Sequence, residues 1–224
     1  MSRVLGIDEA GRGCVLGALY VGGFVVELED PDALRAAGAA DSKTLTPKRR
    51  LEARKRLEAL GTHDVVPIHA TEIDEASLNA LEEAAILTLI RRYRPALVRM
   101  DALGPPKGVG KLIARFEGQL RPDERPQAWV IEPKADGTYP VVGAASIFAK
   151  TTRDDALAAL ADEHGALGSG YPHDPVTRKW LREHADTGRP WPYFVRKKWS
   201  TITDLAQGGL FGAAPAPTGD VLGA

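Results

Sequence analysis

Cysteine is almost absent from this sequence. Cys14 is the only cysteine in 224 residues. A single thiol excludes an internal disulfide bond and a zinc site built from several cysteines, and such sparse use is typical of proteins in a reducing compartment. We therefore expect a cytoplasmic protein in which Cys14 serves for packing.

Long apolar runs and an excess of one charge are missing as well. The longest uncharged apolar stretch, residues 14–26, is shorter than the roughly 20 residues of a membrane-spanning helix, and glycine interrupts it. The first residues, MSRVLGID, enter a strand pattern without a charged and then apolar leader, so we expect no export signal. The 29 Lys and Arg nearly cancel the 30 Asp and Glu. Any surface that attracts nucleic acid must therefore be local.

Strand-like and helix-like segments alternate along the chain. Strand-like runs occur at residues 3–8, 15–26, 63–69, 97–101 and 128–132. The segment between the first two is too short for a crossover helix, which predicts an antiparallel pair, whereas helical segments separate the later strands as in parallel units. Residues 141–163 suit one long helix or two with a break near 151–155. The sequence thus predicts an α/β fold with a mixed five-stranded sheet flanked by helices.

Acidic residues stand where three of these strands end. Asp8 and Glu9 end the first strand, Asp101 ends the fourth, and Asp136 follows the fifth. Neighbouring strand ends form the ligand crevice of open α/β sheets, so these carboxylates can converge. Two like charges ~4 Å apart repel by ~4 kcal/mol at an effective dielectric constant near 20, and protonation or a cation relieves this. Taken singly, Asp101 or Asp136 is more often a solvated turn residue, so the prediction depends on the coincidence of the acids.

Carboxylates without clustered cysteine or histidine suit hard cations such as Mg²⁺ or Mn²⁺. Two such ions ~3.5–4 Å apart can activate water on one side of a phosphodiester and stabilise the leaving oxygen on the other. As strand neighbours, Asp8 and Glu9 should point to opposite faces, but Gly11 and Gly13 can curl the chain so that both approach one substrate. The alternative is an ordinary capped tight turn. The pattern favours a metal-dependent nuclease.

The sequence resembles ribonuclease HII, the type 2 ribonuclease H, in four motifs that occur in the expected order. They are GIDEAGRG at 6–13, DSKTL at 41–45, KADGTYPVVGAASIFAKTTRD at 134–154 and GSGYPHDPVTR at 168–178. The sister enzyme ribonuclease HIII typically has Ser and Lys where Ala10 and Arg12 stand here. The segments GSGYPHDP and FVRKKW are similar to the archaeal and eukaryotic-type members.

The resemblance implies a ribonuclease H-like fold, with a catalytic domain at 1–160 and a C-terminal helical substrate-binding part at 161–203. Residues 204–224, rich in Gly, Ala and Pro, are expected to form a flexible tail. The implied ligands of two Mg²⁺ or Mn²⁺ ions are Asp8, Glu9, Asp101 and Asp136, with Asp64 and Asp74 as weaker competitors. The implied reaction cuts the RNA strand of RNA–DNA hybrids, and nicks DNA 5′ of embedded ribonucleotides, to leave a 3′-hydroxyl and a 5′-phosphate.

The resemblance also implies how the substrate is recognised. The backbone of Gly11, Arg12 and Gly13 would contact the 2′-hydroxyl beside the cut, the group that distinguishes RNA from DNA. Tyr171 would stack on the neighbouring deoxyribose, which favours a ribonucleotide followed by DNA. For Tyr171, a packing or surface role is the alternative.

Four further residues are candidates for phosphate binding. Ser42 and Lys43 match the segment of the family that holds the phosphate backbone in register, with a solvated turn as the alternative. Lys150 and Arg153 lie in the third motif and could hold phosphate or shield the acids. Solvated helix positions are the alternative for these two.

Residues 176–199 supply the local basic surface. They carry seven Lys or Arg against two acids, interleaved with Trp180, Trp191, Tyr193, Phe194 and Trp199. The basic groups would bind a duplex with strong salt dependence, while we expect the aromatic residues to form the core of the C-terminal part. Residues 207–211, QGGLF, resemble the peptide by which replication proteins bind a sliding clamp. The alternative is a disordered tail that binds no partner. We expect a monomer.

Two other functions stay open. A ribonuclease H-like DNA resolvase or transposase-type nuclease would keep the fold and the acids, but the GRG and GYP motifs speak against it. A non-catalytic hybrid-binding module would keep the fold without the chemistry, and the presence of all four carboxylates speaks against that.

Overall fold

The computed structural model describes residues 3–27, 29–39, 45–104 and 106–206. The predicted phosphate contacts Ser42 and Lys43 and the predicted clamp peptide at 207–211 lie outside these ranges. Among the described helices, none combines the length and the apolar character needed to cross a membrane.

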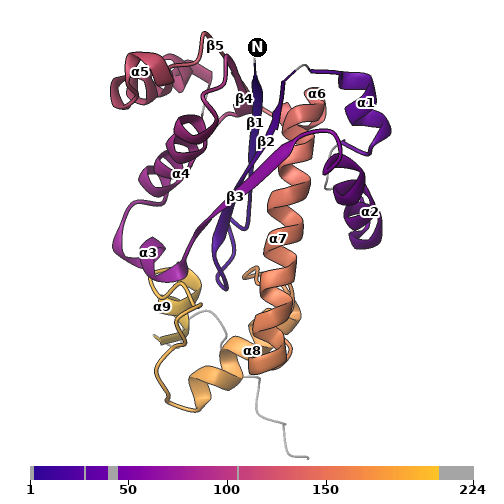
Figure 1. The fold of residues 1–224 in the computed structure, drawn as a ribbon. Coiled ribbons are helices and arrows are strands. Elements are labelled where there is room, and N and C mark those ends of the chain that lie inside the picture. Colours follow the sequence, from indigo (N-terminus) through magenta and orange to yellow (C-terminus); the bar gives the residue numbers. More distant parts are fainter. Residues whose placement is uncertain (1–2, 28, 40–44, 105, 207–224) are drawn as a thin grey trace, which may run out of the picture.

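A five-stranded sheet forms the centre of the fold (Figure 1). In spatial order its strands are β3 (Thr62–Ile68), β2 (Leu19–Val26), β1 (Val4–Ala10), β4 (Leu97–Asp101) and β5 (Ala128–Glu132). β1 pairs antiparallel with β2 and parallel with β4, and β4 pairs parallel with β5. The mixed five-stranded sheet predicted from the sequence is confirmed. Because β1 and β4 are parallel neighbours, their C-terminal ends place Asp8 and Asp101 at the same edge.

The sequence predicted that the third strand follows the second as a parallel unit, but the structure pairs the two in antiparallel fashion. β3 is antiparallel to β2, although helices α1 (Pro31–Ala36) and α2 (Pro47–Leu57) separate the two strands in sequence. Thr62 pairs with Val25, so the connection leaves and returns at the same end of β2. The two helices therefore belong to a connection between antiparallel neighbours and do not form a crossover between parallel strands.

The second strand starts at Leu19, later than residue 15 as predicted. Residues 15–18 bond instead to the C-terminal part of the chain: the N–H of Val15 donates to the carbonyl of Gly170 at 2.8 Å, and that of Gly17 donates to Phe194 at 2.8 Å. The segment has strand-like composition because its side chains are buried, but its backbone partners lie outside the sheet.

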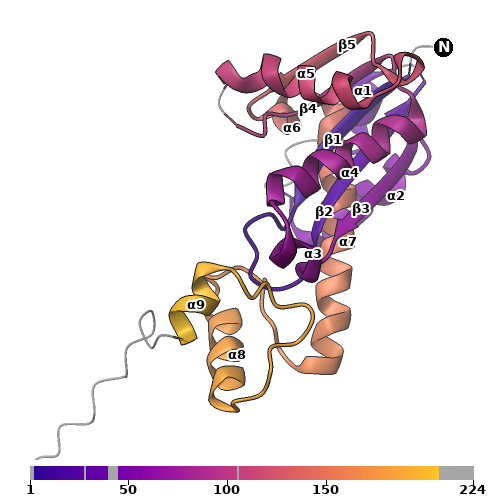
Figure 2. The ribbon, with the colours of Figure 1, turned by 90° about the vertical axis from the view of Figure 1, so that its left-hand side faces the viewer.

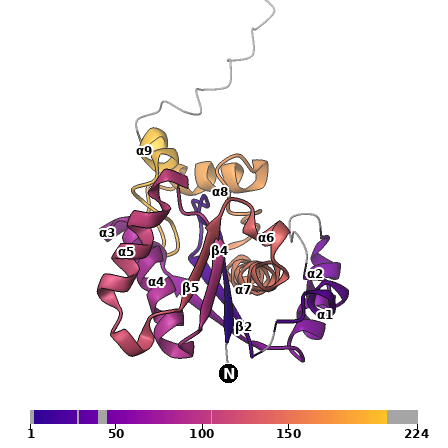
Figure 3. The ribbon, with the colours of Figure 1, turned by 90° about the horizontal axis from the view of Figure 1, so that it is seen from above.

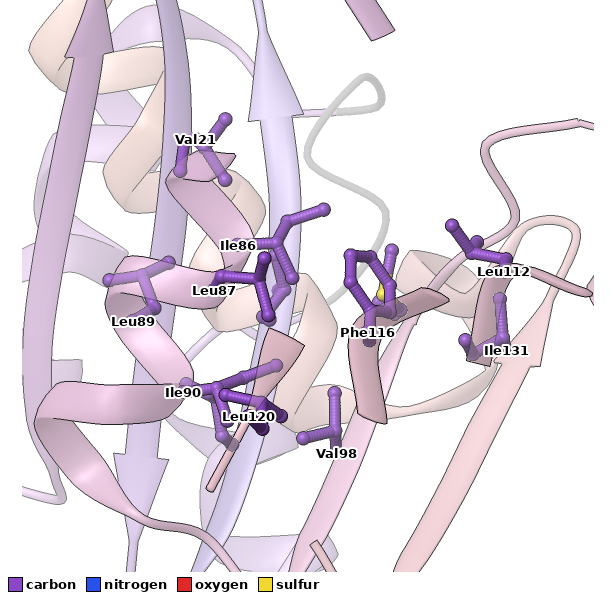
Figure 4. Packing of buried hydrophobic residues seen from close by; sticks show 14 of the residues in the cluster. Val21, Ile86, Leu87, Leu89, Ile90, Val98, Leu112, Phe116, Leu120 and Ile131 are labelled. Atoms are coloured by element: carbon purple, nitrogen blue, oxygen red, sulfur yellow. The ribbon is translucent and has the colours of Figure 1, made fainter. Parts of the chain in front are cut away.

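Helices cover both faces of the sheet (Figure 3). One face carries α4 (Leu78–Tyr93) and α5 (Val109–Gln119), and the other carries α7 (Pro140–His164) with α1 and α2. On the first face, Phe116 packs among Leu112, Ile131 and other apolar side chains (Figure 4), and its ring stacks on Trp129 with 5.5 Å between centroids. Full burial of a side chain of this size contributes about 1.5–3 kcal/mol.

The remaining described elements are short. They are α3 (Ala70–Glu75), α6 (Ala135–Thr138), α8 (Pro175–Asp186), α9 (Ser200–Ala206) and two 3₁₀ turns at Pro106–Gly108 and Pro122–Glu124. α8 and α9 lie beyond the end of the sheet, near the C-terminal end of α7 (Figures 1 and 2).

α7 packs directly against the backbone of the sheet. A Cβ atom at Gly6 of β1 would lie 2.2 Å from the carbonyl oxygen of Val141, and one at Gly22 of β2 would lie 2.6 Å from that of Ala145. Only glycine permits this approach. Residues 141–149 are all buried, and α7 runs unbroken through 151–155 and past residue 160. The sequence therefore forms one helix here, and its close approach brings α7 beside the end of β1.

The C-terminal part has its own apolar cluster, which Val15 and Leu16 join from the segment after β1. Phe194 is buried in this cluster, and Trp180, Trp191 and Trp199 pack against it, as predicted for the aromatic residues of 176–199. Tyr193 differs, because 64% of its surface is exposed.

Candidate active site

A cavity of about 170 Å³ lies at the C-terminal ends of β1 and β4. It is lined by Asp8, Glu9, Ala10, Gly11, Arg12, Gly13, Asp101, Lys150, Arg153 and Tyr171. These residues come from β1 and the following loop, from β4, from α7 and from the loop before α8. We call Asp8, Glu9 and Asp101 the carboxylate wall, and Gly11, Arg12, Gly13 and Tyr171 the loop wall. The structure thus brings together three of the four predicted metal ligands and most of the predicted substrate contacts.

Asp136 is buried but is not among the residues that line the cavity. It lies on α6, which is bonded to the carboxylate wall because the N–H of Ala135 donates to Oδ1 of Asp101 at 2.6 Å. Asp136 accepts from the N–H of Gly137 at 3.0 Å through its own Oδ1. The predicted crowding of four carboxylates is therefore only partly present, because backbone N–H groups of α6 engage one oxygen of each of these two acids. Among the described residues, no three acid, histidine or cysteine side chains form a group that could hold a metal ion as they stand.

Burial makes the charged forms of the β1 acids unfavourable. The pKa of Asp8 is raised to about 7, first by burial and then by the neighbouring charge of Glu9, while hydrogen bonding to Ser146 and the charge of Lys150 act in the opposite direction. Burial also raises the pKa of Glu9; the guanidinium of Arg12 opposes this, and the charge of Asp101 adds to it. Lys150 donates to Oγ of Ser146 at 3.0 Å, so α7 places a cation beside this pair.

The Arg12 side chain points towards α4. It forms an ion pair with Glu82 of α4, whose side chain is 1% exposed, and its Nη2 donates to Oδ1 of Asn79 at 2.6 Å. Gly11 has a φ of +87°, which favours glycine, and a Cβ there would lie 3.0 Å from the carbonyl oxygen of Ala18. The loop is thus anchored through the Arg12 side chain, and its backbone is left to line the cavity.

Arg196 holds the same loop from the other side. Its side chain is fully buried, and it donates to the carbonyls of Gly11 at 2.7 Å, Arg12 at 2.9 Å and Gly17 at 3.0 Å. Burial lowers its pKa to about 10. The sequence interpretation counted Arg196 among the basic surface residues of 176–199 and missed this role. The sequence did contain a sign that Arg196 is buried, since it directly follows the apolar pair Phe194 and Val195.

Tyr171 is held in place by neighbours on two sides. The guanidinium of Arg153 lies 5.2 Å from the centroid of its ring, and its hydroxyl is hydrogen-bonded to the Cys14 thiol. Arg153 also donates to the carbonyl of Ser169 at 2.6 Å and pairs with Asp154 at 3.5 Å. Arg153 therefore supports Tyr171, and Cys14 packs in the interior as predicted.

The two competing acids have structural partners elsewhere. Asp64 pairs with Arg92 and accepts from the N–H of Val65. Asp74 accepts from the backbone N–H groups of Lys197 and Lys198, each at 3.0 Å, and so fastens the C-terminal part to α3. Neither acid lines the active-site cavity.

Comparison with known proteins agrees with this geometry. The family model described as Ribonuclease HII matches residues 5–202. The chain is 38% identical to the ribonuclease HII of Aeropyrum pernix over 92% of this chain and 91% of that protein, and 37% identical to that of Pyrococcus horikoshii over 92% and 93%.

Solved structures give the same result. The ribonuclease H2 of Pyrococcus horikoshii superposes with a TM-score of 0.82 at 34% identity, covering 92% of this chain and 97% of that one. Ribonuclease HII in the PCNA:RNase HII complex from Archaeoglobus fulgidus gives 0.76 at 35% identity, covering 88% and 94%. A ribonuclease HIII solved with Mn²⁺ gives 0.74 at 15% identity, covering 92% and 70%, which shows the shared fold alone. The chain belongs to the ribonuclease HII family and is an endoribonuclease.

Proposed function

We propose that this enzyme is a metal-dependent ribonuclease H that cuts the RNA strand of RNA–DNA hybrids and nicks duplex DNA on the 5′ side of embedded ribonucleotides. The products would carry a 3′-hydroxyl and a 5′-phosphate. One observation carries the proposal: a single cavity combines buried, mutually repelling carboxylates with a glycine-containing backbone loop and a tyrosine ring. This combination suits a charged reaction centre beside a site that recognises a sugar. The enzyme would serve ribonucleotide removal in DNA repair and replication, in the cytoplasm.

The donor set fits hard divalent cations. Carboxylate oxygens are the preferred ligands of Mg²⁺ and Mn²⁺, and the raised pKa values of Asp8 and Glu9 support a site where a cation would stabilise the charged forms. Asp8, Glu9 and Asp101 would hold the ions from the cavity, and Asp136 would reach them from α6. Two bound ions would supply an activated water and stabilise the departing 3′-oxygen.

The protein groups would position the substrate. The backbone of Gly11, Arg12 and Gly13 lines the cavity while the Arg12 side chain is bound to α4, which suits recognition of a 2′-hydroxyl by the backbone. The ring of Tyr171 lies 3.6 Å from where a Cβ of Gly13 would stand, so a sugar stacked on it would adjoin this loop. Lys150, beside Asp8, would hold the phosphate near the cut.

A sliding clamp is a proposed partner. The PCNA:RNase HII complex from Archaeoglobus fulgidus supports it, and so does the clamp-like peptide Gln207–Phe211. We keep three further expectations as proposals: a monomer, a catalytic domain at 1–160 with a substrate-binding part at 161–203, and a tail at 204–224. Deleting residues 207–224 should abolish clamp binding in a pull-down and leave cleavage of free substrate unchanged. Retained binding would show that the clamp contacts another surface.

The proposed function is tested with a DNA duplex that contains one ribonucleotide, and with an RNA–DNA hybrid, each with Mg²⁺, Mn²⁺ or EDTA. The wild type should cut both substrates only with metal, and Asp136→Asn should not cut. Asp64→Asn is the matched control, because Asp64 lies outside the cavity, and it should retain activity. Failure to cut beside the ribonucleotide would reject the nicking activity. Cutting of branched all-DNA substrates would favour a resolvase, and binding without cutting would favour a hybrid-binding module.

A further inference from the structure

α2 is far more basic than the rest of the chain. Its eleven residues, PKRRLEARKRL, contain six Lys or Arg and one Glu, in a protein whose net charge is −1. Its apolar side chains Ala53 and Leu57 are buried in the cluster that α7 shares. This surface is separate from the basic stretch 176–199, because α2 lies beside α7 near the sheet while α8 lies beyond the sheet (Figure 1).

The basic residues of α2 fall into two groups. Arg50, Arg54 and Arg56 bind the protein: Arg50 pairs with Asp154 at 2.9 Å, Arg54 donates to Oγ1 of Thr151 at 3.0 Å, and Arg56 donates to the carbonyl of Ala37 at 3.1 Å.

Lys48, Arg49 and Lys55 form the second group, which we call the outer basic face. All three are exposed, and their side chains have no ion pair or hydrogen bond with other described residues. Lys48 and Lys55 are seven residues apart and so lie on the same side of the helix, about 10 Å apart along its axis. No described residue forms an ion pair or a side-chain hydrogen bond with these three charges.

The helix that carries the outer basic face is linked to the active-site cavity through its inner side. Arg50 of α2 pairs with Asp154 of α7 at 2.9 Å, and Asp154 pairs at 3.5 Å with Arg153, which lines the cavity. These two ion pairs link α2 to the wall that holds Tyr171.

We propose that Lys48, Arg49 and Lys55 bind the phosphate backbone of the substrate duplex, beyond the nucleotides that enter the cavity. This inference rests on the proposed function and adds a second surface to it. Charge complementarity and the ion-pair link between α2 and the cavity wall favour nucleic acid. A membrane surface fits less well, because the apolar side of α2 is buried and Leu51 is its one large apolar side chain with more than a third of its surface exposed.

The test compares Lys48→Gln/Arg49→Gln/Lys55→Gln with a control of equal charge change, Arg91→Gln/Arg94→Gln/Arg125→Gln. The control arginines are exposed, and Arg94 and Arg125 precede β4 and β5, at the ends opposite Asp101. Binding of a fluorescent duplex with one ribonucleotide is measured in EDTA, so that no cutting occurs, over a range of KCl concentrations. Thermal melting checks that each variant is folded.

Each phosphate contact contributes about −0.9 to the slope of log K against log salt, so the outer-face variant should lower the magnitude of the slope by about 2–3 and the control by less than about 1. At low salt its Kd should rise about tenfold or more, and KM should rise while kcat changes less than about twofold. A wild-type slope and Kd in the outer-face variant would overturn the inference. Lys55→Gln alone, which removes one exposed charge, should lower the magnitude of the slope by about 1. This single variant replaces the triple variant in the test if the triple variant does not fold.

Failure of this inference can be told apart from failure of the proposed function. If the wild type binds the duplex but never cuts beside the ribonucleotide, the proposed function is wrong. The binding data in EDTA still test whether the outer basic face binds the duplex. If the wild type cuts and the outer-face variant binds equally well at every salt concentration, only the inference is wrong.

Discussion

The two walls of the active-site cavity are built in opposite ways. On the carboxylate wall, burial and the neighbouring Glu9 raise the pKa of Asp8 to about 7. On the loop wall, the carbonyls of Gly11 and Arg12 accept hydrogen bonds from the buried Arg196. The protein itself therefore supplies hydrogen-bond partners for the loop wall, whereas the carboxylate wall would gain stability from the proposed cations.

Under the proposed function, the loop wall recognises the substrate and the carboxylate wall carries out the chemistry. A backbone loop can distinguish a hydroxyl from a hydrogen only if its donors and acceptors are already in place, and the Arg196 contacts keep them there. Buried acids that repel one another bind a divalent ion tightly because the ion removes an unfavourable interaction. We therefore expect metal removal to stop turnover and to leave substrate binding largely intact.

Arg196→Met should have the largest effect on stability. The change removes three hydrogen bonds made by a buried guanidinium and leaves the Gly11 carbonyl with the Cys14 N–H as donor, so the free energy of unfolding should fall by about 3–5 kcal/mol, measured by urea denaturation. Arg189→Met is the control, because Arg189 is an exposed arginine of the same basic stretch, and it should change stability by less than about 0.5 kcal/mol. Equal stability of the two variants would mean that Arg196 does not hold the loop.

Arg196→Lys tests the positioning role more directly. The ammonium group keeps the charge but cannot reach three acceptors in the fixed geometry of a guanidinium. We expect a folded enzyme whose preference for a ribonucleotide over a deoxyribonucleotide at the cut is reduced, while its metal dependence is unchanged. Wild-type preference in this variant would show that the loop wall does not need the guanidinium.

Asp8→Asn should have the largest effect on catalysis alone. If Asp8 is a metal ligand as proposed, its loss should lower kcat at least about 100-fold, since even residues that only support ligands lower activity 10- to 100-fold. Binding of the same duplex in EDTA should be unchanged or tighter, because a negative charge near the phosphates is removed. A variant with near-normal kcat would exclude Asp8 as a ligand, and a large loss of binding in EDTA would contradict the separation of the two walls.

Metal binding should raise the melting temperature through the carboxylate wall. At Mn²⁺ or Mg²⁺ concentrations near 100 Kd, binding stabilises a protein by about 2.7 kcal/mol, which corresponds to about 5–10 °C for a chain of this length. The same metal should not shift the melting temperature of Asp8→Asn, although this variant should be the more stable of the two in EDTA. A metal-induced shift of equal size in both proteins would place the ions elsewhere.

The parts of the site that the sequence predicted depend on local rules. The sequence placed Asp8 and Asp101 at strand ends, where acids can converge, and the pairing of β1 with β4 brings them to one edge. The lengths of the connections predicted the mixed sheet. The glycines around Arg12 predicted a close backbone approach, and Gly11 indeed requires a positive φ.

The parts that the sequence did not predict depend on contacts between distant segments. Residues 15–18 have strand-like composition, but their backbone groups bond to Gly170 and Phe194, which no local pattern shows. Arg196 lies in a basic stretch that resembles a surface, and only the folded chain brings it to the loop wall. The position of Asp136 depends on α6 and on its bond to Asp101, both of which are set by tertiary packing.

Asp174→Ala should have the smallest effect, because Asp174 supports the loop wall only through the segment that carries Tyr171. Its carboxylate accepts from the N–H groups of Val176 at 2.7 Å and Thr177 at 3.1 Å, which caps α8, and from that of Ser169 at 3.0 Å. Loss of a helix cap of this kind lowers the free energy of unfolding by about 1–2 kcal/mol.

The effect of Asp174→Ala should depend on pH in a defined direction. Hydrogen bonds, that with Ser169 first, lower the pKa of Asp174 from 3.8 to about 2. Because the folded-state pKa lies below the ordinary value, the stabilisation is complete above pH 4 and is lost as the pH falls towards 2. The difference in free energy of unfolding between wild type and Asp174→Ala, measured by urea denaturation, should therefore be constant between pH 5 and 7 and should shrink below pH 4. A difference that stays constant down to pH 2 would show that the charged carboxylate is not what caps α8.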